Sequence, residues 1–156
     1  MKGLVLAIGA VVTAVSLSYG LGIASASSSS AAAGTKVGVA SSTLGRILVD
    51  SHGRTLYLFA KDKKGKSACS GQCAKFWPPL LTKGKPKAGS GVKASLLGTT
   101  KRSDGTTQVT YNKHPLYRFL NDNNKVGSTK GEGLDAFGAE WYVVGTNGKK
   151  IEKEGS

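Results

Sequence analysis

The sequence predicts a mainly β, antiparallel domain assembled from two tandem hairpin repeats. The first observation is an internal duplication, because residues 49–62 align without a gap on residues 109–122. The second is that each copy is followed by a tryptophan with an apolar tail, Trp77–Leu81 and Trp141–Val144. The third is that short β-prone runs alternate with turn residues inside each copy. We therefore expect the two units to pack about a pseudo-two-fold axis into one domain.

Each copy of the duplication is typical of a β-hairpin. Residues two apart on a strand share a face, so Tyr57 and Phe59 are expected to point one way and Leu56 and Leu58 the other. In the second copy Arg118 takes the place of Leu58, which predicts a wetter face there. The expected hairpin strands and turns, in chain order, are 47–49, 51–54, 56–59, 108–111, 112–115 and 116–119. Residues 37–39 and 141–144 are further strand candidates, and short helices are expected at 73–76 and 92–97.

The chain of 156 residues fits one such domain behind a targeting segment. Lys2 precedes an apolar run that ends in Ala24-Ser25-Ala26, a small-x-small site typical of signal-peptide cleavage. The alternative is an uncleaved membrane anchor, since the apolar run approaches the length that spans a bilayer. The predicted organisation is a signal peptide at 1–26, a Ser/Ala-rich linker at 27–35, a duplicated β domain at 36–151 with repeats at about 43–82 and 104–146, and a tail at 152–156.

The motifs resemble one known family. The duplicated Tyr-x-Phe-x-x-Asp, the Cys-x-x-x-Cys before Trp-Pro-Pro-Leu, and residues 98–112 are similar to the bacterial "secreted repeat of unknown function" proteins. That group is also described as predicted lipoproteins with a Yx(FWY)xxD motif, and the resemblance covers about residues 43–151. It implies an exported, envelope-associated, β-rich protein and implies no activity. The chain departs from lipoprotein members because no cysteine lies near the cleavage site, so a lipid anchor is not implied here.

The repeat motif supplies most of the candidate site residues. The aromatic members are expected in the core or between the units, although tyrosines and tryptophans would also suit a groove for sugars or flat ligands. The two aspartates are expected to cap the turn after each strand, and the alternative is binding of a cation or a basic partner. These residues are Tyr57, Phe59, Asp62, Trp77, Tyr117, Phe119, Asp122 and Trp141.

The chain has two cysteines, Cys69 and Cys73. Export favours a disulfide between them. The alternative is a redox couple or a metal pair, with His52 or His114 as further ligands. Redox enzymes favour two residues between the cysteines, and here there are three. The spacing also matches no standard zinc module, so we predict neither a metal site nor a cofactor.

Charge is the broadest functional signal, with 22 Lys and Arg against 9 Asp and Glu and a net charge of +13. For an exported protein this favours anionic cell-surface polymers or lipid head groups as partners, not nucleic acid. The alternative is that the lysines only keep the loops solvated. The lysines concerned are Lys61, Lys63, Lys64, Lys66, Lys83, Lys85 and Lys87.

No catalytic constellation is present in the sequence, so no catalytic residue is predicted and a non-enzymatic role is favoured. The first hypothesis is an exported binding or structural module, which is secreted, periplasmic or associated with the cell envelope. The alternative is an envelope redox or metal-handling protein that uses Cys69 and Cys73. The sequence predicts no oligomeric state.

Overall fold

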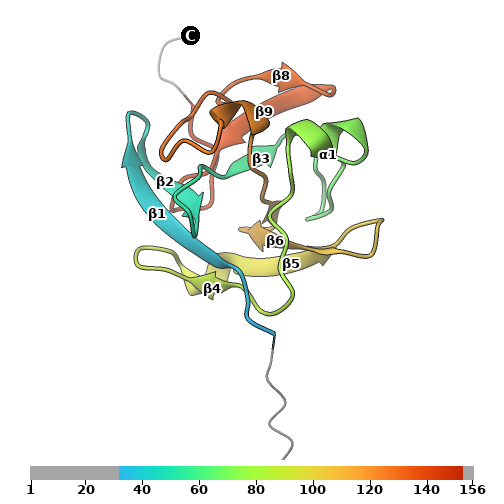
Figure 1. Cartoon of the computed structure of the whole chain (residues 1–156), viewed down its shortest axis with the longest axis horizontal. Helices are drawn as coiled ribbons and strands as arrows, with labels where there is room; N and C mark the ends of the chain where they lie inside the picture. Colours follow the sequence, from blue (N-terminus) through green and yellow to red (C-terminus); the bar gives the residue numbers. More distant parts are fainter. Residues whose placement is uncertain (1–31, 153–156) are drawn as a thin grey trace, which may run out of the picture. The chain divides into compact units, whose positions relative to one another are not determined.

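The computed structural model describes residues 32–152 (Figure 1). The predicted signal peptide, linker residues 27–31 and tail residues 153–156 lie outside the described residues. Thr35, the last residue of the predicted linker, is hydrogen-bonded to the domain. Its amide donates to Thr82 Oγ1 at 3.0 Å, and its hydroxyl donates to the Leu81 carbonyl at 2.7 Å. The strands are β1 (Lys36–Ser42), β2 (Gly45–Asp50), β3 (Tyr57–Phe59), β4 (Lys87–Ala88), β5 (Leu97–Lys101), β6 (Thr107–Tyr111), β7 (His114–Pro115), β8 (Asp135–Ala136) and β9 (Ala139–Val143).

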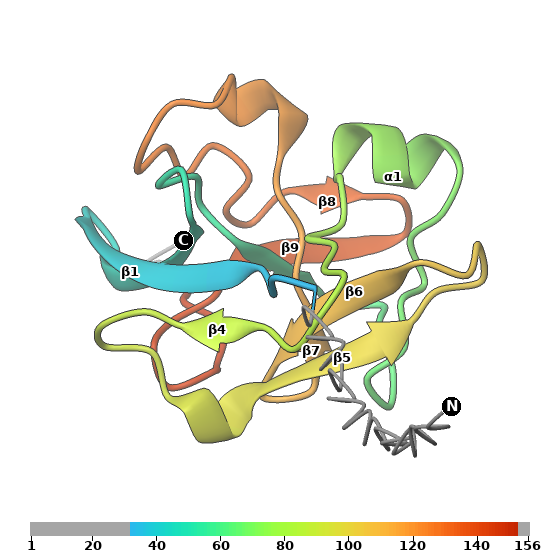
Figure 2. The same cartoon turned by 60° about the horizontal axis from the view of Figure 1, so that its bottom comes forward.

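The predicted mainly β fold is confirmed. The strands form three sheets of three strands, ordered β2-β1-β4, β3-β9-β8 and β5-β6-β7. All pairings are antiparallel except the short parallel pair of β1 and β4, which Figure 2 shows side by side. Within residues 32–152, helix is limited to α1 (Gln72–Phe76) and two single 3-10 turns, η1 (Ala94–Leu96) and η2 (Leu120–Asp122). The helix expected at 73–76 corresponds to α1, and η1 covers only part of the helix expected at 92–97.

The two hairpins differ by one residue in their loops. In the first, the Asp50 amide donates to the Arg54 carbonyl, and the loop ends with Gly53 at φ 77°. In the second, Tyr111 pairs with His114 across Asn112 and Lys113, whose φ angles of 49° and 66° are those of a type I′ turn. The turn predicted over 112–115 is therefore shorter than expected, because His114 and Pro115 already belong to β7.

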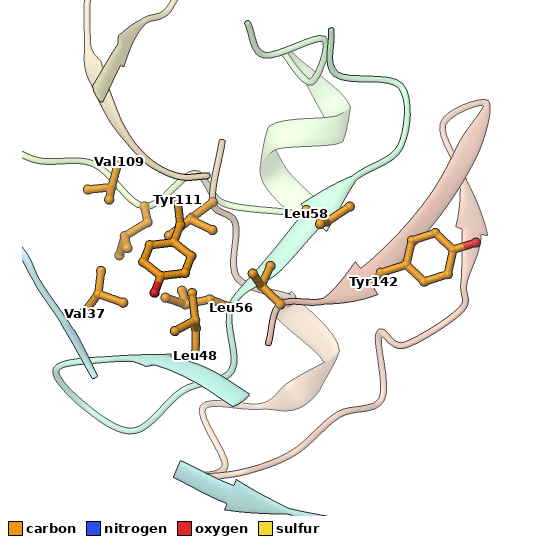
Figure 3. Close-up of a cluster of buried hydrophobic side chains, with 10 residues drawn as sticks. Val37, Leu48, Leu56, Leu58, Val109, Tyr111 and Tyr142 are labelled. Carbon is orange, nitrogen blue, oxygen red and sulfur yellow. The ribbon is translucent and has the colours of Figure 1, made fainter. Parts of the chain in front are cut away.

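Strand β3 lies between two hydrophobic clusters. Leu56 and Leu58 belong to the first cluster, and Tyr57 and Phe59 belong to the second, as the two-residue period predicts. Figure 3 shows the first cluster, where Leu48, Val109 and Tyr111 gather around Leu56. The second, which we call the aromatic cluster, contains Ile47, Val49, Tyr57, Phe59, Cys69, Cys73, Trp77, Tyr117, Trp141 and Val143.

The tryptophan tails connect the repeats by pairing across them. The tail of the second repeat forms β9, whose residues Trp141–Val143 pair with β3 of the first repeat. The tail of the first repeat pairs with the second, because Pro79 bridges Tyr117 and the Leu80 amide donates to the Leu116 carbonyl at 2.8 Å. Each repeat therefore completes the sheet of the other. The wider pseudo-two-fold axis stays a prediction.

Four aromatic rings form a stack whose members alternate between the repeats. The order is Phe59, Trp141, Trp77 and Phe119. Successive ring centroids lie 4.0, 3.9 and 4.1 Å apart. Tyr57 meets the edge of Trp77 at 5.4 Å, and Tyr117 meets Trp141 in the same way at 5.1 Å. Aromatic pairs add stability beyond the area that they bury, so we expect this stack to contribute strongly to the stability of the domain.

The stack predicts a large effect for Trp77→Ala. Trp77 is 1% exposed and contacts Tyr57 of its own repeat and Trp141 and Phe119 of the other. Its loss should lower the free energy of unfolding by about 3–5 kcal/mol, measured by urea unfolding. Phe76→Ala is the matched control. The ring of Phe76, the residue next to Trp77, is 38% exposed, so its removal should lower the free energy of unfolding by less than about 1 kcal/mol. Equal losses for the two variants would contradict the central role of the stack.

Candidate functional site

The repeat motif forms a reciprocal pair of hydrogen bonds, one buried and the other partly buried. Tyr57 donates its hydroxyl to Asp122 Oδ2 at 2.7 Å, and Tyr117 donates its hydroxyl to Asp62 Oδ2 at 2.8 Å. The tyrosine of each repeat therefore bonds the aspartate of the other. Their backbones also exchange two hydrogen bonds, with the Tyr57 amide at 2.8 Å from the Tyr117 carbonyl and the reverse bond at 3.0 Å. A buried tyrosine hydroxyl needs a partner, and each motif supplies one to its counterpart.

The second oxygen of each aspartate orders the loop that follows it. Asp62 Oδ1 accepts from the Ala68 amide at 2.7 Å. Asp122 Oδ1 accepts from the Ser128 hydroxyl at 2.7 Å and from the Lys130 amide at 3.1 Å. The aspartates therefore bond backbone amides, as turn caps do, but they also accept the tyrosine hydroxyls, which sequence reasoning did not anticipate.

These bonds change the acidity of the motif. Burial and the adjacent carboxylates raise the pKa of the Tyr57 and Tyr117 hydroxyls, so both remain protonated donors. Burial also raises the pKa of the Asp62 carboxyl to about 6, against the opposing effects of its bonds from Ala68 and Tyr117. The Asp62 carboxyl therefore changes its protonation state near pH 6, although it also accepts hydrogen bonds from the Ala68 amide and the Tyr117 hydroxyl.

The predicted disulfide between Cys69 and Cys73 is confirmed, and it lies at the edge of the aromatic cluster. Cys69 is 1% exposed and Cys73 is 6% exposed. Thiol exchange needs an accessible sulfur, and this burial favours a structural bond. Arg102, which sequence reasoning missed, holds the loop by donating to the Cys69 carbonyl at 2.7 Å.

The two histidines lie in different hairpins. His52 is exposed beside Ser51, and His114 is half-buried in β7, where burial lowers the pKa of its imidazole. In the part of the chain that the structure describes, no group of three or more His, Cys, Asp or Glu side chains is placed to hold a metal ion.

Three of the four lysines predicted to cluster before the cysteines, Lys63, Lys64 and Lys66, are joined by further lysines from two other turns. A Cβ added to Gly65 would lie 3.4 Å from the Lys113 carbonyl oxygen, so the 63–66 turn lies against the 112–113 turn. Asn112 Nδ2 donates to the Gly148 carbonyl at 3.2 Å, which places the 147–150 turn beside them. We call this surface the first lysine face; it consists of Lys63, Lys64, Lys66, Lys113, Lys149 and Lys150, all exposed.

An open groove of about 430 Å³ lies beside the 147–150 turn of the first lysine face, and its lining includes Lys149 and Lys150. Leu58 and Tyr142 contribute apolar and aromatic surface to its wall, and His114 lies beside them. Lys150 lies over the Tyr142 ring, with its Nζ 4.4 Å from the ring centroid, and also pairs with Glu152. Glu140 is the acidic lining residue, and it accepts a hydrogen bond from the Tyr142 hydroxyl.

The remaining predicted lysines form a separate set. Lys83, Lys85 and Lys87 are exposed, and Lys87 is the register partner of Lys36 in the parallel pair of β1 and β4. Lys83 and Lys85 also line an open cavity of about 330 Å³. We call Lys36, Lys83, Lys85 and Lys87 the second lysine face. Lys61 lies apart from both faces, since its Nζ donates to the Phe137 carbonyl at 3.3 Å.

Several carboxylates are engaged inside the fold, which leaves the lysine faces positive. Asp50 is 4% exposed and pairs with Arg54 at 2.7 Å. Asp62 and Asp122 accept the tyrosine hydroxyls, and Glu132 accepts from the Val143 amide at 2.6 Å. Acidic side chains that bond internal donors are not free to neutralise surface lysines.

These features define a class of small β domain in which two interleaved repeats share an aromatic stack and a buried disulfide. The chain belongs to the family described as secreted repeat of unknown function, whose model matches residues 38–81 and 98–145. One match covers each repeat together with its tryptophan tail. No curated protein and no solved structure matches the chain. None of the helices within residues 32–152 has the length and apolar character that crossing a membrane requires.

The raised pKa of Asp62 predicts an unusual dependence of stability on pH. The folded state holds the Asp62 proton up to about pH 6, whereas the unfolded chain releases it near 3.8. The contribution of this group is therefore full below about pH 4 and is lost as pH rises towards 6. Asp62→Asn should flatten this part of the profile, measured as the urea midpoint between pH 4 and 7.

Asp104→Asn is the matched control for that profile. Asp104 is exposed, and hydrogen bonds from Thr106 lower the pKa of its carboxyl. Its contribution to stability is present at neutral pH and is lost only as pH falls below the ordinary range of aspartate. This variant should leave the slope between pH 4 and 6 as it is in the parent protein. A profile that Asp62→Asn does not change would contradict the titration of Asp62.

Proposed function

We propose that the protein is an exported, non-enzymatic binding module that contacts anionic polymers of the cell surface through its lysine faces. The family is described as secreted, which supports action outside the cytoplasm. The observation that carries the proposal is the convergence of three turns that are distant in sequence on the first lysine face. Six exposed lysines gather there, with Glu140 and Glu152 as the acidic side chains in contact with its groove residues.

A polymer suits this surface better than a small ligand does. The lysines extend over three turns and are exposed, so they offer many weak contacts instead of one enclosed site. A chain with a repeated negative charge engages such contacts together, and the combined attraction exceeds that of any single pair. The open groove adds Ala60 and the small exposed part of the Tyr142 ring as apolar contacts for the polymer backbone.

The redox or metal-handling alternative has less support from the described residues. The Cys69–Cys73 bond is formed and buried among aromatic rings, and neither cysteine is free. His52 and His114 lie in separate hairpins. The lysine faces, in contrast, are exposed and are not explained by the packing of the core.

The test is binding to inorganic polyphosphate and to poly-L-glutamate at increasing salt concentration. Lys63→Gln, Lys64→Gln and Lys66→Gln together should weaken binding at least tenfold, because each lysine near an anionic surface contributes about 1 kcal/mol. Binding by the parent protein should also weaken steeply with salt, since exposed charges are screened. The corresponding variant of Lys83, Lys85 and Lys87 measures the share of the second lysine face.

The matched control removes three exposed lysines that lie outside both faces, Lys75, Lys125 and Lys130, again as glutamines. It has the same net charge as the variant of the 63–66 turn. If the faces bind the polymer, the control should retain affinity within about threefold of the parent. Equal losses in the control and in both face variants would show that only net charge matters and would overturn the proposal.

A further inference from the structure

A small cavity beside the aromatic stack brings two arginines together. It has a volume of about 90 Å³, and its lining includes Arg54, Arg118, Asn124, Pro78 and Phe119. That volume is several times the roughly 10–15 Å³ needed to admit one water molecule. It is far smaller than the groove beside the first lysine face, so it admits a single chemical group and not a polymer segment.

Arg118 is the unusual member of this lining. Its side chain is half-buried, and its Nε is inaccessible to solvent without a hydrogen-bond partner among the residues that the structure describes. A buried donor without a partner costs about 1–3 kcal/mol, and the cost is larger when the group is charged. Burial and the nearby Arg54 guanidinium both lower the pKa of Arg118, which reflects the strain of holding two cations together.

Arg54 is held rigidly at the other side of the cavity. Its Nε and Nη2 both lie 2.7 Å from Asp50 Oδ2, and its Nη1 donates to Asn124 Oδ1 at 3.1 Å. Asp50 thus compensates Arg54, but within residues 32–152 no ion pair compensates Arg118. The cavity therefore contains one guanidinium that is already fixed and one that has no ion pair of its own in the described part of the chain. Burial and Arg54 together outweigh the opposing effect of the Asp50 carboxylate on the pKa of Arg118.

Asp122 also lines the cavity, but its oxygens are already occupied. Its Oδ2 accepts the Tyr57 hydroxyl, and its Oδ1 accepts from the Ser128 hydroxyl and the Lys130 amide. It forms no ion pair with Arg118 in the described structure. An incoming anion would therefore compete with no existing salt bridge to Arg118.

Comparison of the two repeats shows that the fold does not require an arginine here. Leu58 occupies the equivalent position of the first repeat and packs in the first cluster with 4% of its surface exposed. A leucine at position 118 would bury apolar surface without leaving an unsatisfied donor. The repeat therefore accommodates an apolar residue at this position, and an arginine with a buried, unpartnered donor there points to a role outside folding.

We propose that this cavity is an oxyanion-binding site, which takes one carboxylate or phosphate group between Arg118 and Arg54. A guanidinium presents its donors as a planar fork that matches the oxygens of either group. The site differs from the lysine faces, because it recognises a single group by directed hydrogen bonds and not a polymer by distributed charge. It rests on the cavity and on Arg118, and does not depend on the proposed polymer binding.

The test uses the full chain, with inorganic phosphate and acetate as separate probes. The ¹H–¹⁵N resonance of Arg118 Nε, assigned by its loss in Arg118→Lys, should shift with each anion and saturate. Arg118→Leu should weaken anion binding at least tenfold by calorimetry. Without anion, Arg118→Leu should also raise the melting temperature by about 2 °C or more, because the buried donor is gone. A purely structural role for Arg118 would lower it.

The control is Lys101→Gln, which removes one exposed positive charge from the end of β5, outside the cavity and both lysine faces. It should leave anion affinity and the Arg118 resonance shift within twofold of the parent. Saturation by phosphate alone or by acetate alone would support the site and identify its ligand class. Failure of both anions to saturate, or affinity that Arg118→Leu does not reduce, would overturn the proposal. Neither outcome depends on polymer binding, which the lysine variants measure.

Discussion

The aromatic stack of Phe59, Trp141, Trp77 and Phe119 is the interaction on which the rest of the structure depends. Its rings alternate between the repeats, so neither repeat can bury its tryptophan without the other. The same requirement explains the exchange of tails, because each tryptophan reaches the stack only if its tail pairs with the partner strand. A small domain gains from this arrangement, since the two halves share one core instead of building two.

The stack also explains why the motif ends in an aspartate. Placing Tyr57 and Tyr117 against the tryptophan edges buries their hydroxyls, and a buried hydroxyl needs an acceptor. Asp122 and Asp62 provide it across the repeat boundary, and their second oxygens order the following loops. The motif is therefore one structural unit, in which the aromatic residues determine the packing and the aspartates satisfy the polar groups that this packing buries.

The sequence predicted the local part of this structure well. The two-residue period assigned Leu58 and Tyr57 to opposite clusters, and the turn residues located both hairpins. It did not predict that Trp141 pairs with the first repeat, because the choice of partner strand depends on contacts distant in sequence. For the same reason Lys113 was missed on the first lysine face and the cavity at Arg118 was not foreseen as a site. The substitution of Leu58 by Arg118 was the one sequence signal that pointed to that cavity.

The duplication itself indicates where function resides in this domain. Positions shared by both repeats, such as Tyr57 with Tyr117, are fully occupied by the stack and its hydrogen bonds. A recognition surface needs side chains that the fold leaves free, and these occur where the copies differ. The 63–66 turn contains three lysines where the second repeat has one at 123–126, and Arg118 replaces the Leu58 of the first repeat. In both proposals, the candidate binding residues therefore lie where the copies diverge, on a frame that both copies share.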